Sequence, residues 1–248
     1  MPRIHVGIGG WVFPEWRDNF YPKGLPQKQE LDHASRRLTS IEINGTFYGS
    51  QKPASFARWH DETPEDFVFS LKASRYVTNR RVLAEAGPSM LRFLGSGLTA
   101  LKAKLGPINW QFPPTKTFDA ADFEAFLRLL PQQQDGLALR HVVEVRHESF
   151  AVPEFTALLR QYQVAVAIAD KPDFPCIEEI TAPFAYVRLQ CASEDEALGY
   201  APAALDAWAD RARTWEVRDA FLYFINGHKP KAPAAAMALI ERLGGRTA

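Results

Sequence analysis

The chain has 248 residues, of which 46% are hydrophobic, and its 29 lysines and arginines balance 29 aspartates and glutamates. That length and apolar content allow one large domain with a substantial core, so we predict a single domain over residues 1–248. A net charge of zero argues against broad nucleic-acid binding through a basic surface, and we do not expect a nucleic-acid partner.

Eight short apolar runs, rich in β-branched and aromatic residues, recur along the chain as expected for β-strands. Most are followed directly by a polar side chain, which we expect to point to the same buried face as its strand. In chain order the runs are Val6–Ile8 leading into Gly9-Gly10-Trp11, Ile41–Ile43 with Asn44, Phe67–Leu71 with Lys72, Ile108–Trp110 with Gln111, Val142–Val145 with Arg146, Val164–Ala169 with Asp170, Phe184–Val187 with Arg188, and Phe221–Ile225 with Asn226. This is the layout of a (β/α)8 TIM barrel, whose active sites lie at the carboxyl ends of the strands.

Helical periodicity separates most of these runs. We expect a helix from Pro53 to the residues before Thr63-Pro64, and further helices over 87–105, from Asp119 or Asp122 to Pro131, from Pro153 to Tyr162, over 202–213 and over 232–243. Three prolines between Asp170 and Phe184 leave little room for a helix, so the barrel should be irregular between its sixth and seventh strands. A doubly wound open sheet is the main alternative, but Gly7-Ile8-Gly9-Gly10-Trp11 lacks the glycine spacing of a phosphate-binding turn.

A series of phrases in one order resembles a known family. They are Gly9-Gly10-Trp11 with Trp16 and Phe20-Tyr21-Pro22, Ile41–Asn44 with Thr46-Phe47-Tyr48, Phe67–Lys72, Gly106-Pro107-Ile108 with Gln111–Pro114, Val143–His147, Tyr186–Leu189, and Tyr223-Phe224. Together they resemble the YecE-like family, known as domain of unknown function 72, over nearly the whole chain. The resemblance implies a TIM barrel with a polar pocket at the strand carboxyl ends, and it implies no reaction.

Three positions depart from that family's pattern. The chain has Thr78-Asn79 where the family often has Thr-His, and Gln190-Cys191 where it often has His-Gly. It ends its last strand with Asn226-Gly227-His228 in place of an Asn-Asn-Asp-like sequence. Roles that the family assigns to those positions do not carry over to this chain.

A closed barrel would gather a charged cluster in its upper interior, made of Glu42, Asn44, Lys72, Gln111, Glu144, Arg146, Asp170, Arg188 and Asn226. So many buried charges indicate a functional site, because apolar residues would fill the same space at a smaller cost in folding free energy. We therefore predict an enzyme, with its class open among hydrolase, isomerase and lyase, that acts on a small polar anionic substrate by acid/base or hydrolytic chemistry.

The roles follow from side-chain chemistry. Arg146 and Arg188 would anchor the anion with bidentate forks, and Glu144 and Asp170 would transfer protons. Lys72 with Glu42 would stabilise developing charge; burial also suits Lys72 to act as a base or a Schiff-base nucleophile. The remaining roles fall to Asn44, Gln111 and Asn226, which would orient hydroxyls, and to Trp11 and Tyr48, which would help to close the mouth.

Three other interpretations stay open. The cluster could be a structural salt-bridge lattice built from Glu42–Lys72 and from Glu144 with Arg146 or Arg188. It could be a non-catalytic module that binds an anion or a nucleic-acid end. It could belong to a metal-dependent phosphodiesterase or nuclease that uses Glu42, Glu144 and Asp170, although His147 lies on the opposite parity from Glu144.

No cofactor or metal motif supports an added group. The histidines show neither HxH nor HExxH spacing, and Cys176 and Cys191 lack CxxC spacing, so no metal, cofactor or disulfide is expected. No signal-peptide pattern follows Met1 and no apolar run approaches a membrane span, so we expect a cytoplasmic protein without a membrane partner. The sequence leaves the oligomeric state open.

Overall fold

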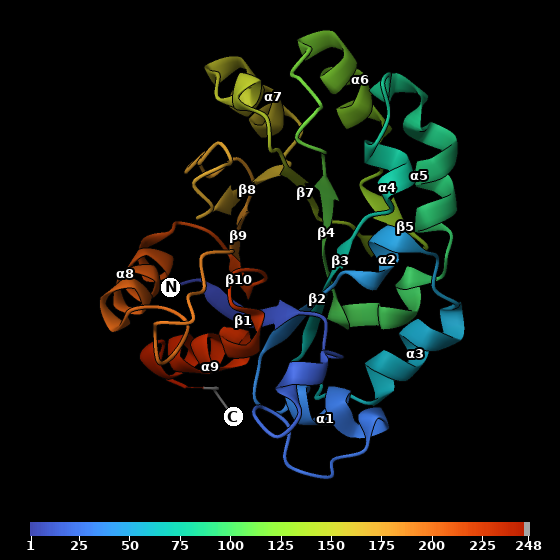
Figure 1. The fold of residues 1–248 in the computed structure, drawn as a ribbon. Helices are drawn as coiled ribbons and strands as arrows, with labels where there is room; N and C mark the ends of the chain where they lie inside the picture. The colour runs from blue at the N-terminus through green and yellow to red at the C-terminus, as the bar shows by residue number, and fades with distance from the viewer. Residues whose placement is uncertain (246–248) are drawn as a thin grey trace.

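The eight apolar runs form parallel strands that close into a barrel in the computed structural model, which describes residues 1–245 (Figure 1). Around the barrel the strand order is β1-β10-β9-β8-β7-β4-β3-β2. Their bounds are β1 Arg3–Gly9, β2 Ser40–Ile43, β3 Val68–Lys72, β4 Leu105–Gln111, β7 His141–Glu144, β8 Ala165–Ala169, β9 Phe184–Leu189 and β10 Asp219–Phe224. The predicted TIM barrel is confirmed, because a closed ring excludes the doubly wound open sheet.

Helices surround the barrel on its outside (Figure 1). They are α1 Glu30–Ser35, α2 Gly45–Tyr48, α3 Pro53–Asp61, α4 Arg75–Thr78, α5 Gly87–Leu94, α6 Ala120–Leu129, α7 Pro153–Gln161, α8 Pro202–Thr214 and α9 Ala232–Arg242. Proline begins α3, α7 and α8, where its missing N–H is no loss. The Asp119 side chain caps α6 by accepting a hydrogen bond from the Asp122 N–H at 2.9 Å. Between β8 and β9 the described chain forms no helix, as its prolines predict.

Two local predictions were wrong or incomplete. The expected helix over 87–105 breaks after α5, and a 3-10 stretch, Leu98–Lys104, follows. Gly97 lies at the break with φ +91°, and a Cβ there would meet Pro53 Cγ at 2.6 Å, so the turn needs glycine. A hairpin of β5 Gln133–Gln134 and β6 Leu137–Ala138 went unpredicted, although Asp135-Gly136, with two positive φ angles, is a typical hairpin turn.

The chemistry inside the barrel changes along its axis. Near the amino ends of the strands, the His5 ring stacks on Phe221 at 4.8 Å between centroids. In the middle, the Tyr223 hydroxyl lies 2.6 Å from both the Ser40 and the Ser70 hydroxyls. We call these amino ends the bottom of the barrel and the carboxyl ends its mouth. The charged side chains considered below therefore rest on an aromatic and hydroxyl floor.

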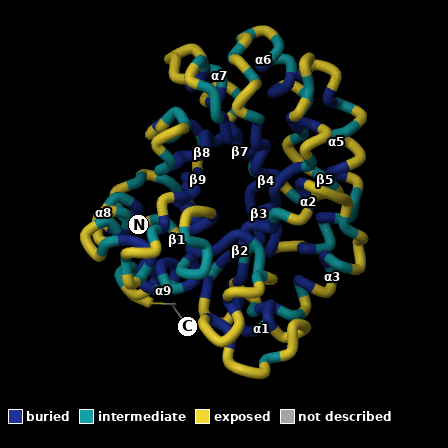
Figure 2. The backbone as a smooth tube through the Cα atoms, viewed as in Figure 1, coloured by how far each residue is buried: buried dark blue, intermediate teal, exposed yellow. Residues whose placement is uncertain are grey.

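Burial follows the same plan. The barrel strands are buried, whereas the outer faces of the helices and many loops are exposed (Figure 2). Within residues 1–245, no helix has both the length and the apolar character needed to cross a membrane.

Candidate active site

At the mouth, one arginine joins two buried carboxylates. Arg188 on β9 donates from Nε and Nη2 to the Glu42 carboxylate at 3.0 and 2.8 Å, and from Nη1 to Glu144 Oε2 at 2.7 Å. The Tyr186 hydroxyl donates to Glu42 Oε2 at 2.6 Å. Arg188, Glu42 and Glu144 are each at most 1% exposed. All three guanidinium nitrogens of Arg188 are thus occupied by the protein, and its fork is not open to a ligand.

A second arginine extends this bridge toward solvent. Arg146 donates from Nε and Nη2 to Glu144 Oε1 at 3.0 and 2.8 Å, and from Nη2 to Gln111 Oε1 at 2.5 Å. Its guanidinium lies 4.7 Å from the centre of the Phe174 ring, in the loop after β8. Among the described residues, Arg146 Nη1 has no hydrogen-bond acceptor, and the residue is only half-buried. Arg146 therefore keeps one donor group free for a ligand.

The charges of this network reinforce one another. Burial would raise the pKa of Glu144, but the positive charges of Arg188, Arg146 and Lys72 outweigh it and lower the pKa to about 2. Burial would lower the pKa of Arg188, but Glu144 and Glu42 raise it above its ordinary value. Burial and the neighbouring Glu42 charge raise the pKa of Tyr186. Glu144 and Arg188 therefore stay ionised, with Tyr186 as a neutral hydrogen-bond donor.

Lys72, the last residue of β3, differs from every other member of the network. It is only 7% exposed, yet its ammonium makes no hydrogen bond or ion pair within residues 1–245. Its Nζ lies over the Phe47 ring, 4.3 Å from the centroid. Burial and the Arg188 charge lower the pKa of Lys72 to about 8, against the opposing influence of Glu42 and Glu144. A nearly buried, unpaired amine with a lowered pKa is the kind of group that general-base and nucleophilic chemistry require.

The five charged groups of the mouth do not balance. Three cations, Lys72, Arg146 and Arg188, stand against two carboxylates, Glu42 and Glu144. Their formal sum is +1 when Lys72 is protonated. The two groups without a partner in the described structure, Lys72 Nζ and Arg146 Nη1, belong to the two least buried of these five residues.

Several predicted site residues do converge. Glu42, Lys72, Gln111, Glu144, Arg146 and Arg188 share the interior and are linked by hydrogen bonds or by the charges that shift the pKa of Lys72. Asn44 follows Glu42 at the half-buried rim, and Tyr48 is exposed there, with its ring edge-on to Phe47 at 5.1 Å. Of the expected lattice pairs, Glu144 binds both arginines, whereas Glu42 binds Arg188 instead of Lys72.

Asp170 does not lie on the interior face as predicted. Ala165 and Ala167 face the interior, and alternation turns Asp170 the other way. Its carboxylate accepts hydrogen bonds from the Gln190 N–H at 2.5 Å and the Tyr200 hydroxyl at 2.7 Å, and burial raises its pKa. Asp170 thus connects the loop after β9 to the end of β8. It does not lie with Glu144 in the barrel interior, where the two were expected to transfer protons.

Asn226 and Trp11 also lie outside the cluster. Ile225 is the interior residue after β10, and exposed Asn226 donates to Gln190 Oε1 at 3.1 Å. Trp11 packs edge-on against Trp59 and Phe69, at 5.2 and 6.3 Å, on the outer side of the barrel wall. Trp11 thus anchors α3 to the sheet and does not close the mouth.

Three residues of the cluster were not among the predicted catalytic and substrate-binding residues. Tyr186 binds Glu42, Phe47 lies under Lys72, and Asn109 donates to Glu144 Oε2 at 3.2 Å. A signal existed for two of them, because Asn109 shares the strand parity of Gln111 and Tyr186 shares that of Arg188. Asn109 is fully buried, and its Oδ1 has no donor among the described residues.

Metal binding finds no ligand set in the part of the chain that the structure describes, where no three His, Cys, Asp or Glu side chains form a group that could hold an ion. The Glu42 and Glu144 carboxylates are directed at arginines, and His147 Nδ1 lies 2.9 Å from the Ser149 hydroxyl. The phosphodiesterase or nuclease interpretation therefore lacks the ligands that it requires.

Fold and site together define a TIM-barrel protein with a buried ion network at its mouth, in which Lys72 has no hydrogen-bond or ion-pair partner among the described residues. The chain belongs to the family described as protein of unknown function DUF72, whose model matches residues 5–248. This confirms the family resemblance that its phrases predicted.

Relatives and solved structures agree with this assignment. The chain is 27% identical to UPF0759 protein YecE of Escherichia coli (strain K12) over 150 residues, which are 59% of this chain and 50% of YecE. It is 27% identical to UPF0759 protein YunF of Bacillus subtilis (strain 168) over 158 residues, 61% of this chain and 54% of YunF. The chain thus spans about half the length of these relatives.

Two crystal structures of DUF72 family proteins share the fold. One, TM1631 from Thermotoga maritima MSB8, has a TM-score of 0.79 at 22% identity and covers 98% of this chain and 99% of its own. The other, EF0366 from Enterococcus faecalis V583, has a TM-score of 0.75 at 16% identity and covers 97% and 95%. At these identities the likeness concerns the fold alone.

Proposed function

We propose that the barrel mouth binds a small anionic substrate and that Lys72 performs acid/base chemistry on it. The observation that carries this proposal is the unpaired Lys72 ammonium inside a network with a net formal charge of +1. A buried cation without a counter-charge lowers the stability of the folded protein. A bound anion supplies that partner.

Two groups would hold the anion. Lys72 Nζ and Arg146 Nη1 have no protein acceptor in the described structure, and both act from a poorly solvated wall where charge-assisted hydrogen bonds are strong. Their charges influence each other, since Arg146 contributes to lowering the pKa of Lys72. Arg188 is then a positioning residue that fixes the Glu42 and Glu144 carboxylates. It does not anchor the anion, which is the role that the sequence predicted for it.

The same lysine suits proton transfer. A pKa of about 8 leaves roughly a tenth of the amine unprotonated at neutral pH, and general bases work best when their pKa is near the operating pH. Glu42 and Glu144 are poor bases here, because Arg188 and Arg146 occupy their oxygens. The proton-transfer role therefore moves from Glu144 and Asp170 to Lys72.

A non-catalytic anion-binding module is the second candidate. It is favoured by the fact that the carboxylates of Glu42, Glu144 and Asp170 all accept hydrogen bonds from the protein. The two candidates share the anion site and differ in whether a bound compound is converted.

The anion site is tested by titrating oxalate into the purified protein with isothermal calorimetry. Oxalate has two carboxylates and no ketone, so it reports binding alone. We expect Lys72→Met and Arg146→Met each to weaken binding at least about tenfold, as for the loss of one charge-assisted contact. Lys104→Met, at the far end of the barrel, is the matched control and should bind like the wild type. Failure of the wild type to bind millimolar oxalate, or equal affinity in all variants, would overturn the proposal.

Conversion is tested separately from binding. The protein is incubated in D2O with a pool of small carboxylates and phosphate esters, and NMR follows deuterium uptake or product formation. Acid/base chemistry predicts a change that Lys72→Met abolishes. Binding without any conversion by the wild type would establish the binding module instead.

A further inference from the structure

Lys72 has the properties of a nucleophile as well as those of a base. An amine attacks a carbonyl only when its lone pair is free of a proton and of a hydrogen-bond partner. The Lys72 ammonium has no acceptor within residues 1–245, and it lies over the face of Phe47. The residue is 7% exposed, so a small part of its surface faces solvent.

Another lysine in the chain shows how unusual this is. Lys104, just before β4 at the bottom of the barrel, is 5% exposed. Its ammonium donates to the His60 carbonyl, to the Thr63 carbonyl at 2.8 Å and to the Thr63 hydroxyl at 3.2 Å. Burial lowers the pKa of both lysines, but only the Lys72 nitrogen is left without a hydrogen bond.

We propose that Lys72 forms an imine with the ketone or aldehyde carbon of a small 2-oxo carboxylate whose carboxylate binds Arg146. This rests on the anion site proposed above and names the class of compound that it would hold. Such a compound carries a carboxylate and a carbonyl on adjacent carbons, and the mouth offers a free guanidinium donor and a free amine.

The step conserves atoms and involves no oxidant or reductant. The neutral Lys72 nitrogen attacks the carbonyl carbon, the carbonyl π bond breaks toward oxygen, and a carbinolamine forms. Two protons leave the nitrogen and join the carbonyl oxygen, which departs as water while the C=N bond forms. Protonation of the imine from solvent gives the iminium ion, which stabilises a carbanion at the neighbouring carbon.

An unpartnered acceptor lies on the strand next to that of Lys72. Asn109 on β4 is the register partner of Lys72 on β3, and it is fully buried. Its Nδ2 donates to Glu144, which leaves Oδ1 without a donor in the described structure. The Lys72 ammonium does not donate to this atom, whereas the hydroxyl of a carbinolamine extends beyond the nitrogen and would supply a donor for it.

The electrostatics agree with this chemistry. The charged groups that act on Lys72 are Arg188 on β9, Glu42 on β2, Glu144 on β7 and Arg146 after it. Burial and Arg188 hold the pKa of Lys72 at about 8, so imine formation should accelerate as the pH rises toward 8. An ordinary exposed lysine would need a pH above 10 for the same gain.

Borohydride trapping tests the proposal. The full chain is incubated with pyruvate or glyoxylate, reduced with sodium borohydride, and examined by intact mass and peptide mapping. We expect one stable secondary amine per chain, located on Lys72 and suppressed by oxalate. Labelling at Lys72 should exceed that at any other lysine, Lys104 included, by at least about tenfold, because the carboxylate site at Arg146 would hold the carbonyl compound next to Lys72.

Oxalate binding and trapping, both measured on the wild type, separate this inference from the anion site. Oxalate has no ketone or aldehyde and reports the anion site alone, whereas trapping reports the imine. If the wild type binds oxalate but yields no adduct on Lys72, the imine is ruled out and the anion site stands. If oxalate does not bind, both fail. Adducts spread evenly over surface lysines would likewise overturn the inference, and that result needs no folded variant.

Discussion

The two ends of the barrel both contain buried charge, but they use it differently. At the bottom, Asp219 is 4% exposed and binds Arg3 and Arg140 at 2.7 and 3.1 Å, and Lys104 holds the carbonyls at the end of α3. At the mouth, Arg188 binds two carboxylates, and the Lys72 ammonium has no hydrogen bond or ion pair within residues 1–245. The bottom satisfies its buried lysine within the protein, whereas the mouth leaves its own unsatisfied.

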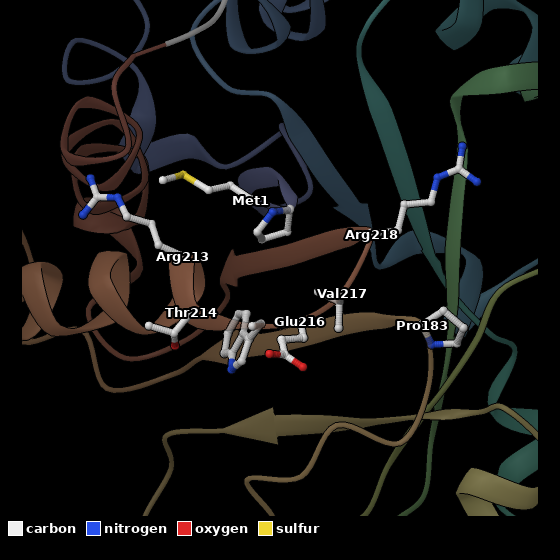
Figure 3. Close-up of a pocket in the computed structure, with 9 residues that line it drawn as sticks. Met1, Pro183, Arg213, Thr214, Glu216, Val217 and Arg218 are labelled. Carbon is white, nitrogen blue, oxygen red and sulfur yellow. The ribbon is translucent and has the colours of Figure 1, made fainter.

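One cavity at the bottom of the barrel illustrates the difference between the two ends. An open cavity of about 510 Å³ is lined by Met1, Arg213, Glu216 and Arg218 among others. In Figure 3 Arg213 and Arg218 lie on opposite sides of it, with Glu216 between them. These side chains do not converge on a point, so this cavity lacks a constellation like that of the mouth. In TIM barrels the residues at the bottom usually serve stability, and the active site usually lies at the carboxyl ends of the strands.

Removing the arginine that organises the mouth should have the largest effect. Arg188→Met would leave the Glu42 and Glu144 carboxylates buried without their shared partner. We expect the free energy of unfolding to fall by about 3 to 5 kcal/mol, as when one member of a buried ion pair is removed. Urea denaturation measures this. The triple variant Arg188→Met, Glu42→Gln, Glu144→Gln should regain most of the loss; a single-variant loss below about 1 kcal/mol would show that the bridge is not a structural unit.

Removing the unpaired lysine should do the opposite. The folded pKa of Lys72 is about 8 and its ordinary value is 10.5, so the unfolded chain binds more protons between these values. Wild-type stability should therefore rise as the pH increases from 8 to 10.5. Below pH 8 the charged lysine destabilises the fold by on the order of 3 kcal/mol, and Lys72→Met should raise stability by up to that amount. Thermal unfolding at pH 7 and pH 10 checks it, and a lower Tm for the variant at pH 7 would contradict it.

These two expectations depend on contacts that the sequence could not supply. Strand parity correctly brought Glu42, Lys72 and Glu144 to one face. The partner of Glu42 depended on how Arg188 reaches across the mouth from β9 to β2, since the two strands are not neighbours. The sequence predicted an ion pair between Glu42 and Lys72, because their strands are adjacent. In the structure the guanidinium of Arg188 binds Glu42 instead.

Strand alternation explains why Asp170 and Asn226 do not lie in the barrel interior. Counting alternation from Ala165 and from Phe221 puts Asp170 and Asn226 on the outer face. Trp11 is different, because Gly10 has φ +74° and turns the chain toward α3. Nothing in the sequence pattern fixes such a turn, so the role of Trp11 could not be read from its neighbours.

A pH experiment isolates the bottom of the barrel. Burial, with Arg140 and Arg3, lowers the pKa of His5 from 6.5 to about 4, although Asp219 opposes this. The unfolded chain therefore binds more protons between pH 6.5 and 4, and stability falls as the pH drops through that window. His5→Phe keeps a ring against Phe221 and should remove about 2 kcal/mol of the loss between pH 7 and pH 5.

Urea denaturation at the two pH values gives the comparison. His141, whose pKa burial also lowers to about 4, is present in both proteins and cancels. Glu144 at the mouth has a pKa of about 2 and titrates from 4.5 downward in the unfolded chain, so it adds little above pH 5. Equal losses for His5→Phe and wild type would show that His5 is not held neutral.

Lys104→Met provides the smallest effect and the most direct comparison of the two ends. The change deprives the His60 and Thr63 carbonyls, at the end of α3, of their ammonium donor. Relief of the burial that lowers the pKa of Lys104 offsets part of that loss, so we expect stability to fall by about 1 kcal/mol. The same Lys-to-Met change should thus stabilise the mouth and destabilise the bottom, as urea denaturation at pH 7 would show. Equal signs at both positions would mean that hydrogen bonding to the ammonium does not distinguish the two lysines, and the case for a reactive Lys72 would lose its physical basis.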